Sequence, residues 1–506
     1  MMYNILELLE LTAAARPEKT AVIDENGADR FDTLLSRSRR CGTALAAHLS
    51  PTAPVPVLLE KSREALYAFF GAAYAGCFYV PLSPALPQPR LAQILSVLQA
   101  PCIVTDREHA ALAAQLPGVG RILPIEDLLQ TQADDALLAR IRSCAIDGDP
   151  LYCNFTSGST GTPKGVVVSH RSVLDFIPVF TELFRIGPDD IIGNQAPLDF
   201  DVSVKDIYSA LHTGATLVLL PRRLFSQPSA LMDALCTHRV TTLIWAVSAL
   251  CLVSSFHGLD YRTPETVNKV LFSGEVMPPK HLKSWMEHLP HADFVNLYGP
   301  TEITCNCTYH RIESGRDYTA GIPLGTAFPN ERVFLLNEAG QEIHTPDQAG
   351  EICVSGAALA LGYYNNPGQT QAAFTQHPGH SRYLQPIYRT GDLGRWNAAG
   401  ELYFLGRKDF QIKHMGHRIE LEEIERAVQE VEGVSRCCCV YDAQKERLHG
   451  FYTGTADKAA VRSALAQKLP VFMLPRTLEP LDSLPLTENG KTDRKRLLAL
   501  ARKEIV

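Results

Sequence analysis

The chain has 506 residues, of which 46% are hydrophobic and 20% charged, a length that exceeds one ordinary core and predicts a large domain with a smaller one. The net charge of −7 and the lack of a Lys/Arg block argue against nucleic acid or a membrane as partner and favour a small molecule. The N-terminus has no signal-peptide pattern, no apolar run reaches transmembrane length, and the thirteen cysteines lack paired metal spacing, so we expect a cytoplasmic protein with reduced thiols.

Helix and strand patterns alternate over the first 150 residues, which predicts a layered α/β domain. The clearest segments are a helix over 63–75 and a strand over 102–105. The prolines at 81, 84, 87 and 89 exclude a helix before Arg90, so we expect a loop there.

The alternation continues from 151 to about 310. Apolar runs predict strands over 216–220, 242–245 and 269–272. Polar or glycine-rich loops follow several of these strands, which is where α/β sheets place ligands. This part of the chain should therefore carry the binding site.

Short strands, including 332–336 and 351–354, predict a β-rich subdomain over 320–405. A final segment of about 100 residues has a helix over 420–430 and a strand over 434–440, and it predicts a small α+β domain. Core packing of Cys437, Cys438 and Cys439 in that strand is favoured over metal binding.

A hydroxyl-rich, glycine-rich turn, Phe155-Thr-Ser-Gly-Ser-Thr-Gly-Thr-Pro-Lys-Gly165, follows an apolar strand. Glycines let backbone amides approach an anion, the hydroxyls add donors and Lys164 adds charge, so the turn suits polyphosphate. It is not a Walker A loop, because Pro163 precedes the lysine and Gly165 follows it. The alternative for an isolated turn of this composition is a surface loop.

Six motifs in order resemble those of the adenylate-forming superfamily, specifically the adenylation domains of nonribosomal peptide synthetases and D-alanine:carrier-protein ligases. The resemblance covers essentially the whole chain. The motifs are Thr156–Gly165, Phe200-Asp-Val-Ser203, Asn296-Leu-Tyr-Gly-Pro-Thr-Glu302, Tyr388-Arg-Thr-Gly-Asp392, Gly406-Arg-Lys-Asp409 and Asn489-Gly-Lys491. The resemblance implies a large α/β domain over 1–408 with a β-rich subdomain, and a mobile C-terminal α+β domain over 409–506 with its hinge at Asp409.

The resemblance also implies an ATP site in which Tyr298 stacks on adenine, Asn296 contacts its edge, and Asp392 binds the ribose with help from Arg407. Glu302 and Thr301 would serve Mg²⁺ and the phosphates. An exposed turn is the alternative for this Tyr-Gly-Pro segment. The implied ATP-binding residues are Thr156, Ser157, Gly158, Ser159, Thr160, Gly161, Lys164, Asn296, Tyr298, Gly299, Asp392 and Arg407.

Lys491 is the implied catalytic residue of the C-terminal domain. Its ammonium would neutralise charge that develops between the α-phosphate and the attacking carboxylate, which is electrostatic catalysis without a protein nucleophile. A lysine after Asn-Gly is otherwise expected at an exposed turn.

Asp201 is the family position that pairs with a substrate α-ammonium, which favours an α-amino acid over an aryl or fatty acid; the alternative is that Asp201 caps the next helix. Lys205 favours an acidic or carbonyl-bearing side chain if it points inward, and a small one such as alanine, serine or cysteine if it bends outward. Similarity to the D-alanine ligases keeps D-alanine open. The other implied pocket residues are Val202, Ser248, Leu271, Ser273, Leu297, Cys305 and Asn306.

The predicted function is therefore ATP-dependent formation of an aminoacyl-AMP, followed by transfer to a phosphopantetheine thiol of a carrier protein acting in trans. An acyl- or aryl-CoA ligase is the alternative within the superfamily, and a catalytically silent scaffold is the alternative from another class. The sequence leaves open whether the chain acts alone or is part of a larger synthetase.

Overall fold

The computed structural model describes residues 2–158, 162–319, 321–486 and 492–502. The chain divides into two compact units. Unit 1 comprises Met1–Pro84, Leu98–Asn154 and Gly165–Lys408, and unit 2 comprises Ala85–Val97, Phe155–Lys164 and Asp409–Val506. No helix in the described part of the chain is long and apolar enough to cross a membrane.

A mostly parallel sheet forms the centre of unit 1, and nine strands of it lie within the described residues. In spatial order they are β15 (Thr326–Ala327), β14 (Thr308–Arg311), β13 (Asp293–Tyr298), β12 (Lys269–Ser273), β11 (Thr242–Ala246), β9 (Ile191–Asn194), β10 (Thr216–Leu219), β1 (Thr20–Asp24) and β2 (Gly27–Arg30). The strands from β13 to β1 run parallel, whereas β14, β15 and β2 pair antiparallel.

A second sheet has seven strands among the described residues. In spatial order they are β18 (Gly362–Tyr363), β8 (Lys164–Ser169), β7 (Pro150–Thr156), β4 (Phe78–Leu82), β3 (Pro54–Leu58), β5 (Cys102–Thr105) and β6 (Arg121–Pro124). Strands β3 and β4 are buried along their whole length, because parallel sheets are covered on both faces.

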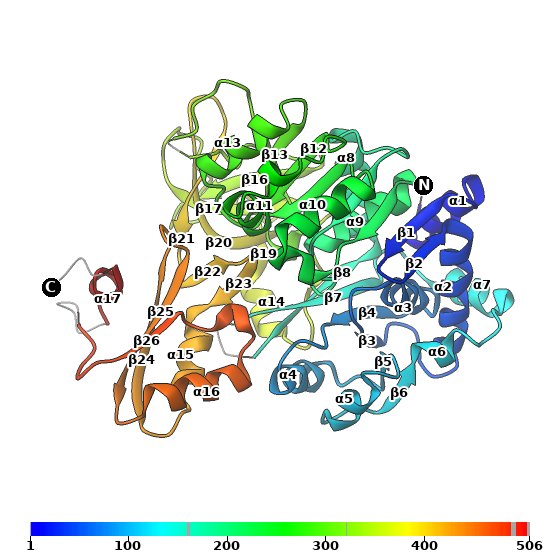
Figure 1. Ribbon diagram of the computed structural model, residues 1–506, viewed down its shortest axis with the longest axis horizontal. Helices are drawn as coiled ribbons and strands as arrows, with labels where there is room; N and C mark the ends of the chain where they lie inside the picture. The colour runs from blue at the N-terminus through cyan, green and yellow to red at the C-terminus, as the bar shows by residue number, and fades with distance from the viewer. Residues whose placement is uncertain (1, 159–161, 320, 487–491, 503–506) are drawn as a thin grey trace. The chain divides into compact units, whose positions relative to one another are not determined.

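Helices cover these sheets, and α2 packs against α3 beside the N-terminal strands (Figure 1). The helices before β13 are α1 (Leu6–Ala15), α2 (Phe31–Ala46), α3 (Arg63–Tyr74), α4 (Gln88–Leu98), α5 (Ala110–Gln115), α6 (Ile125–Leu128), α7 (Asp135–Cys144), α8 (His170–Leu183), α9 (Val202–Thr213), η1 (Arg222–Ser226), α10 (Pro228–Thr237), α11 (Val247–Ser255), α12 (Gly258–Tyr261) and α13 (Pro279–His288). The main hydrophobic core of unit 1 includes residues of both sheets.

The β-rich part of unit 1 follows after a short 3-10 helix, η2 (Thr301–Ile303). Its antiparallel strands are β16 (Glu331–Leu336), β17 (Gly350–Gly356), β19 (Phe374–Gln376), β20 (Pro386–Trp396) and β21 (Leu402–Arg407), with helix α14 (Pro367–Ala373) between β18 and β19. This confirms the predicted β-rich segment.

The C-terminal part of unit 2 is a small α+β fold, as predicted. Its elements are β22 (Gln411–His414), β23 (His417–Glu420), α15 (Leu421–Gln429), β24 (Val434–Asp442), β25 (Arg447–Gly454), α16 (Lys458–Lys468), η3 (Val471–Met473), β26 (Thr477–Pro480) and α17 (Arg494–Arg502). Cys437, Cys438 and Cys439 are buried in β24, which confirms the prediction of core packing.

The predicted strands and helices agree with the structure to within a few residues, with one correction after Val80. Strand β4 continues through Pro81, and α4 begins at Gln88 rather than at Arg90. Pro89 is tolerated there because the first helical turn does not use its own N–H groups in helical hydrogen bonds.

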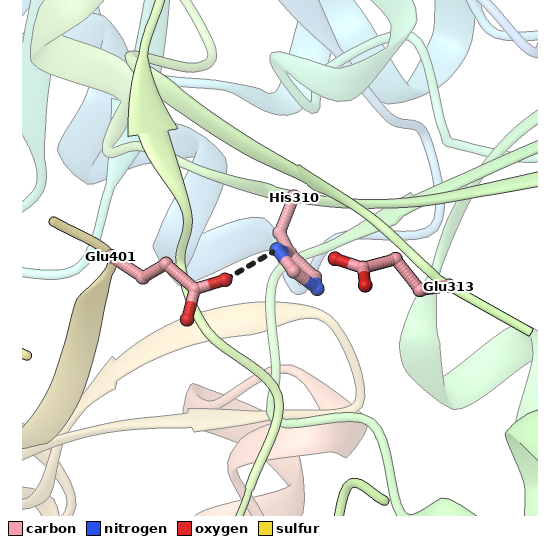
Figure 2. A group of neighbouring side chains, drawn as sticks. All are labelled: His310, Glu313 and Glu401. Carbon is pink, nitrogen blue, oxygen red and sulfur yellow. Dashed lines mark ion pairs between the residues drawn. The ribbon is translucent and has the colours of Figure 1, made fainter. Parts of the chain in front are cut away.

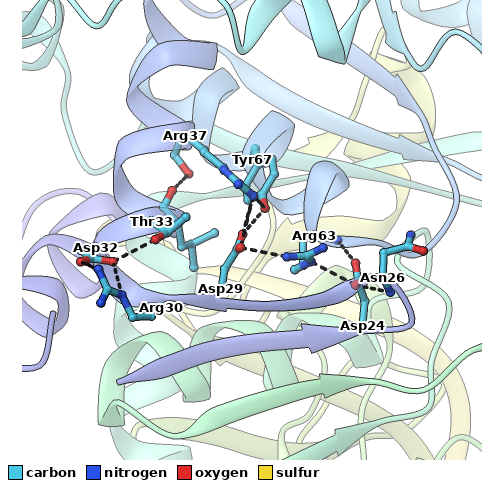
Figure 3. A network of polar contacts seen from close by, with 11 residues as sticks. Asp24, Asn26, Asp29, Arg30, Asp32, Thr33, Arg37, Arg63 and Tyr67 are labelled. Carbon is cyan, nitrogen blue, oxygen red and sulfur yellow. Dashed lines mark hydrogen bonds and ion pairs between the residues drawn. The ribbon is translucent and has the colours of Figure 1, made fainter. Parts of the chain in front are cut away.

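A buried ion-pair network connects the β1–β2 hairpin to α3 (Figure 3). The guanidinium of Arg63 contacts Asp24 at 3.0 Å and Asp29 at 2.8 Å. Asp29 also accepts hydrogen bonds from Tyr67 and Arg37. The side chains of Asp24, Asp29 and Arg63 are 3%, 4% and 10% exposed, so each charge depends on its partner rather than on water.

We expect Arg63→Met to lower the stability of unit 1 by about 3–5 kcal/mol, because it leaves two buried carboxylates without this cation. The measurement is the thermal unfolding temperature. Arg30→Met is the matched control. Arg30 is the last residue of β2 and pairs with Asp32 of α2 through largely exposed side chains, so this substitution should cost at most about 1 kcal/mol. Equal unfolding temperatures for the two variants would contradict this account of the network.

Candidate functional site

Four adjacent parallel strands of the central sheet, β9, β11, β12 and β13, end at the same edge, and the predicted amino-acid site residues lie in these strands or in the segments that follow them. Asp201 comes after β9, and Ser248 comes after β11. Ser273 and Tyr298 are the last residues of β12 and β13. Ligands bind at the carboxyl ends of strands in such sheets, so the topology brings residues nearly 100 positions apart to one edge.

Asp201 occupies the N-cap position of α9 but makes no side-chain capping hydrogen bond. The alternative role, in which its carboxylate caps this helix, is therefore not what the structure shows. The Sγ of Cys305 donates to the backbone oxygen of Asp201 at 3.1 Å. This contact ties the start of α9 to the turn that follows η2.

The backbone of the turn after η2 is strained. Thr304 and Cys305 have φ angles of 53° and 79°, a left-handed conformation that is rare for a β-branched residue. Gly299 makes the turn possible, because a Cβ there would lie 2.4 Å from the Cα of Asn306. The hydroxyl of Thr304 donates to the Ala358 oxygen at 2.6 Å and holds the turn in place.

The side chain of Lys205 points into the protein; the sequence had left open whether it points inward or bends outward. Its side chain is 1% exposed, and Nζ donates to Oδ1 of Asn306 at 2.6 Å. Burial lowers the pKa of Lys205, while Cys305, Asp201 and Asp206 raise it. The Lys205 side chain thus begins one helical turn after Asp201, and its Nζ contacts Asn306, the residue that follows Thr304 and Cys305.

The side chains of Tyr298, Asp392 and Arg407 form a second cluster. The Tyr298 hydroxyl donates to Oδ2 of Asp392 at 2.5 Å, and Arg407 donates to Oδ1 of the same carboxylate at 2.5 Å. Burial and Asp392 together raise the pKa of Tyr298 well above its usual range. Asn296 lies on β13 and donates to the oxygen of Pro323 at 2.8 Å. The buried carboxylate of Asp392 thus binds both Arg407 and Tyr298, which lies 94 positions before it in the chain.

Glu302 is fully buried, which excludes the alternative of an exposed turn. The hydroxyl of Tyr363 donates to Oε1 of Glu302 at 2.7 Å, and the backbone oxygen of Glu302 accepts from Ala360 at 2.8 Å. Thr301, beside it in η2, is partly exposed. Tyr363 was missed by the sequence analysis; it lies 61 residues from Glu302 along the chain, and no local pattern connects the two.

The remaining predicted pocket residues differ in their surroundings. Leu271, Leu297 and Cys305 belong to the main hydrophobic core of unit 1. Val202 and Ser273 are each 5% exposed, and Ser248 is partly exposed at the start of α11.

The predicted phosphate loop lies in unit 2, where Ser157 donates to the Arg418 oxygen at 2.7 Å and Lys164 lies 3.9 Å from Glu420. Oγ1 of Thr156 is buried and has no hydrogen-bond partner among the described residues. A Cβ at Gly158 would lie 2.0 Å from the Thr162 oxygen, so only glycine fits there. Ser159, Thr160, Gly161 and Lys491 lie outside the described residues.

Asp409 begins the C-terminal segment of unit 2, and its Oδ1 accepts from the Gln411 amide at 3.2 Å.

His310, Glu313 and Glu401 form another group of metal-type ligands, with ligand atoms within 4.8 Å of one another (Figure 2). Arg316 already supplies a cation here, since it donates to both oxygens of Glu401 at 2.8 Å and to Glu313 at 3.0 Å. The His310 ring also contacts the Tyr318 hydroxyl at 3.0 Å. Both carboxylates of this group are therefore already paired with Arg316, which favours a structural role over metal binding.

Comparison with known proteins shows the family to which the chain belongs. The AMP-binding enzyme family matches residues 9–364, and the AMP-binding enzyme C-terminal domain matches residues 423–491. The chain is 32% identical over 501 residues to tyrocidine synthase 3 of Brevibacillus parabrevis, covering 97% of the chain and 8% of that protein. It is 32% identical over 489 residues to an L-proline:[L-prolyl-carrier protein] ligase of Streptomyces coelicolor, covering 92% of the chain and 88% of that protein.

Among solved structures, holo-PA1221, a nonribosomal peptide synthetase protein with adenylation and PCP domains, superposes with a TM-score of 0.84 at 28% identity, covering 98% of the chain and 84% of that structure. The chain thus spans nearly all of the prolyl ligase but only a small part of the large synthetase. The family match, the relatives and the residues at the carboxyl edge of the central sheet agree: the chain belongs to the family of AMP-binding, adenylate-forming enzymes.

Proposed function

We propose that the chain uses ATP to activate an amino acid as aminoacyl-AMP, and then transfers the aminoacyl group to the phosphopantetheine thiol of a carrier protein. The observation that carries the proposal is that Asp201 and Glu302 follow strands β9 and β13 of one parallel sheet, and that Tyr298, the last residue of β13, binds Asp392 of β20. The carrier-protein ligase among the relatives and the carrier domain of PA1221 support the second step.

In the first step an oxygen of the substrate carboxylate bonds to the α-phosphorus of ATP, and the bond to the departing pyrophosphate breaks. Asp201 holds the substrate α-ammonium, and the carboxylate of Asp392, oriented by Tyr298 and Arg407, binds the ribose hydroxyls. Tyr298 provides a face for adenine and Asn296 contacts its edge. These residues orient the reactants, and orientation is a main source of acceleration when two charged molecules must meet.

Glu302 and Thr301 fit a Mg²⁺ ion that is bound together with ATP. One carboxylate and one hydroxyl are the donor types that Mg²⁺ accepts when phosphate oxygens and water complete its shell. Glu302 is fully buried and its Oε1 is oriented by Tyr363, as expected for a fixed ligand. The ion would neutralise phosphate charge.

The phosphate loop from Thr156 to Lys164 is proposed to bind the β- and γ-phosphates, which leave as pyrophosphate. Lys491 is proposed to neutralise charge at the α-phosphate. In the second step the thiol sulfur attacks the carbonyl carbon, the bond to AMP breaks, and the thiol loses its proton. Asp409 is proposed as the hinge between the two steps. It lies between β21 and β22, and a few loop residues can absorb such a rotation.

The substrate side chain is proposed to meet Lys205 and Asn306, with Val202, Ser248, Leu271, Ser273, Leu297 and Cys305 as further pocket residues. Lys205 uses one hydrogen bond to Asn306, and an ammonium has three donors. An amino acid with a carboxylate or carbonyl in its side chain would satisfy the other donors.

ATP–pyrophosphate exchange with all proteinogenic L-amino acids, D-alanine, and a set of aryl and fatty acids tests this function. We expect exchange with one or a few amino acids, and formation of a pantetheine thioester of the same substrate. Exchange only with acids that lack an α-amino group would favour the CoA-ligase alternative. If no acid supports exchange, the alternative of a catalytically silent scaffold is favoured.

A further inference from the structure

Lys61 lies in the loop between β3 and α3 and binds the end of a strand in the other sheet. Its Nζ donates to the backbone oxygen of Gln195 at 3.0 Å and to those of Asn194 and Ala196 at 3.4 Å each. These three consecutive carbonyls lie where β9 ends and the connection to α9 begins. One partly buried cation therefore fixes the start of this connection.

The same connection is held from its other side by α9. The Asn194 side chain donates to Oδ2 of Asp206 at 2.7 Å, and both residues are fully buried. Asp201 lies between these two attachment points, at the N-cap of α9. The position of the Asp201 carboxylate therefore depends on the conformation of residues 194–201, the first three of which bind Lys61 through their backbone oxygens.

The charges around Lys61 make this attachment sensitive to pH. Burial lowers the pKa of Lys61 to about 7, although Asp206 and Asp199 raise it. Burial raises the pKa of Asp206 to about 7, against the effects of Asn194, Lys205 and Lys61.

Asp199 completes the group of charges that face Lys61. Burial raises the pKa of Asp199 to about 6; Arg222 and Lys61 lower it and Glu60 raises it. Because these groups interact, the titration belongs to the group rather than to one residue.

We propose that Lys61 is a positioning residue for the amino-acid site: its ammonium holds the 194–201 connection in the conformation that presents Asp201 to the substrate α-ammonium. The proposal rests on the proposed function. When this group of charges titrates near pH 7 and Lys61 loses its proton, three carbonyls lose a charged donor, so affinity for the amino acid falls as the pH rises. ATP binding does not depend on this connection and stays constant.

The test is the KM for the amino acid and for ATP in pyrophosphate exchange, measured from below to above pH 7 for the unsubstituted chain, Lys61→Met and Lys61→Arg. For the unsubstituted chain the amino-acid KM should rise with pH. Lys61→Met should raise this KM by about tenfold or more at low pH, since a hydrogen bond to a charged group is lost, and should abolish its pH dependence. Lys61→Arg should keep the KM for the amino acid low at every pH tested, because arginine keeps its proton over this range.

Lys19→Met is the matched control, because Lys19 also donates to two backbone carbonyls, those of Pro188 and Gly214. These carbonyls are not part of the 194–201 connection, so both KM values should stay within about twofold of the unsubstituted chain.

An unchanged amino-acid KM in Lys61→Met, or an equal rise in both KM values, would overturn the proposal. If Lys61→Met does not fold, the pH profile of Lys61→Arg decides: a retained rise overturns the proposal and a lost rise supports it. Absence of exchange with any amino acid by the unsubstituted chain would instead overturn the proposed function and, with it, this inference.

Discussion

Glu302→Gln is expected to reduce the rate of ATP–pyrophosphate exchange by about 10²–10³-fold, the size of effect seen when one preorganised electrostatic contact to a transition state is removed. Glutamine has the same shape, so the hydrogen bond from Tyr363 and the packing around this fully buried residue can be kept. What is lost is the negative charge proposed to bind Mg²⁺. The Mg²⁺ concentration for half-maximal exchange should rise in parallel, and its titration is the measurement.

Glu331→Gln is the control for this experiment. Glu331 is also a buried glutamate of unit 1, with 8% of its surface exposed. Burial raises its pKa to about 8, so at pH 7 the group is mainly neutral and glutamine removes little charge. Exchange should remain within about twofold of the unsubstituted chain. An equal loss in both variants, or full activity of Glu302→Gln with unchanged Mg²⁺ dependence, would refute the role proposed for Glu302.

Asp201→Asn is expected to raise the KM for the amino acid by about 10²-fold while the KM for ATP stays nearly constant. The physical reason is that a substrate ammonium would lose its carboxylate partner in a largely buried site, a loss that typically costs about 2–5 kcal/mol. Because Asp201 makes no capping hydrogen bond, the substitution should leave α9 intact. The measurement is the pair of KM values together with the thermal unfolding temperature.

Asp175→Asn supplies the comparison, since Asp175 is a partly buried carboxylate on the neighbouring helix α8 whose Oδ2 accepts from Asn330 at 2.6 Å. Asp175→Asn should leave the KM for the amino acid and the KM for ATP unchanged. If Asp201→Asn lowered the unfolding temperature strongly and changed both KM values equally, its carboxylate would be structural rather than part of the amino-acid site.

Much of the fold could be predicted from the sequence, because it depends on local patterns. Apolar runs separated by helical segments predicted the strands and helices of unit 1. The strand predicted over 434–440 extends in the structure over Val434–Asp442. The start of α4 was misplaced because proline reads as a helix breaker, although it is acceptable in a first turn. The order of motifs likewise identified Asp201, Glu302 and Asp392 as candidates.

The contacts between these candidates could not be predicted, since they join residues that are distant along the chain. Local spacing does not reveal that Tyr298 and Arg407 share the Asp392 carboxylate, or that Tyr363 contacts Glu302. Lys61 gave no signal at all, because its partners are backbone oxygens, which every residue has. The direction of the Lys205 side chain also could not be predicted, because a flexible lysine side chain can place its amine in the interior or at the surface.

Residue types and their order along the chain were therefore sufficient for the fold class and for the family, since periodicity and motifs are properties of short segments. Which side chains meet, and which charges are buried, depended on packing between distant segments. In the folded chain Lys205 donates to Asn306. Burial shifts the pKa values of Lys61 and Asp206 to about 7, because the cost of a buried charge is set by the surroundings that the folded chain creates.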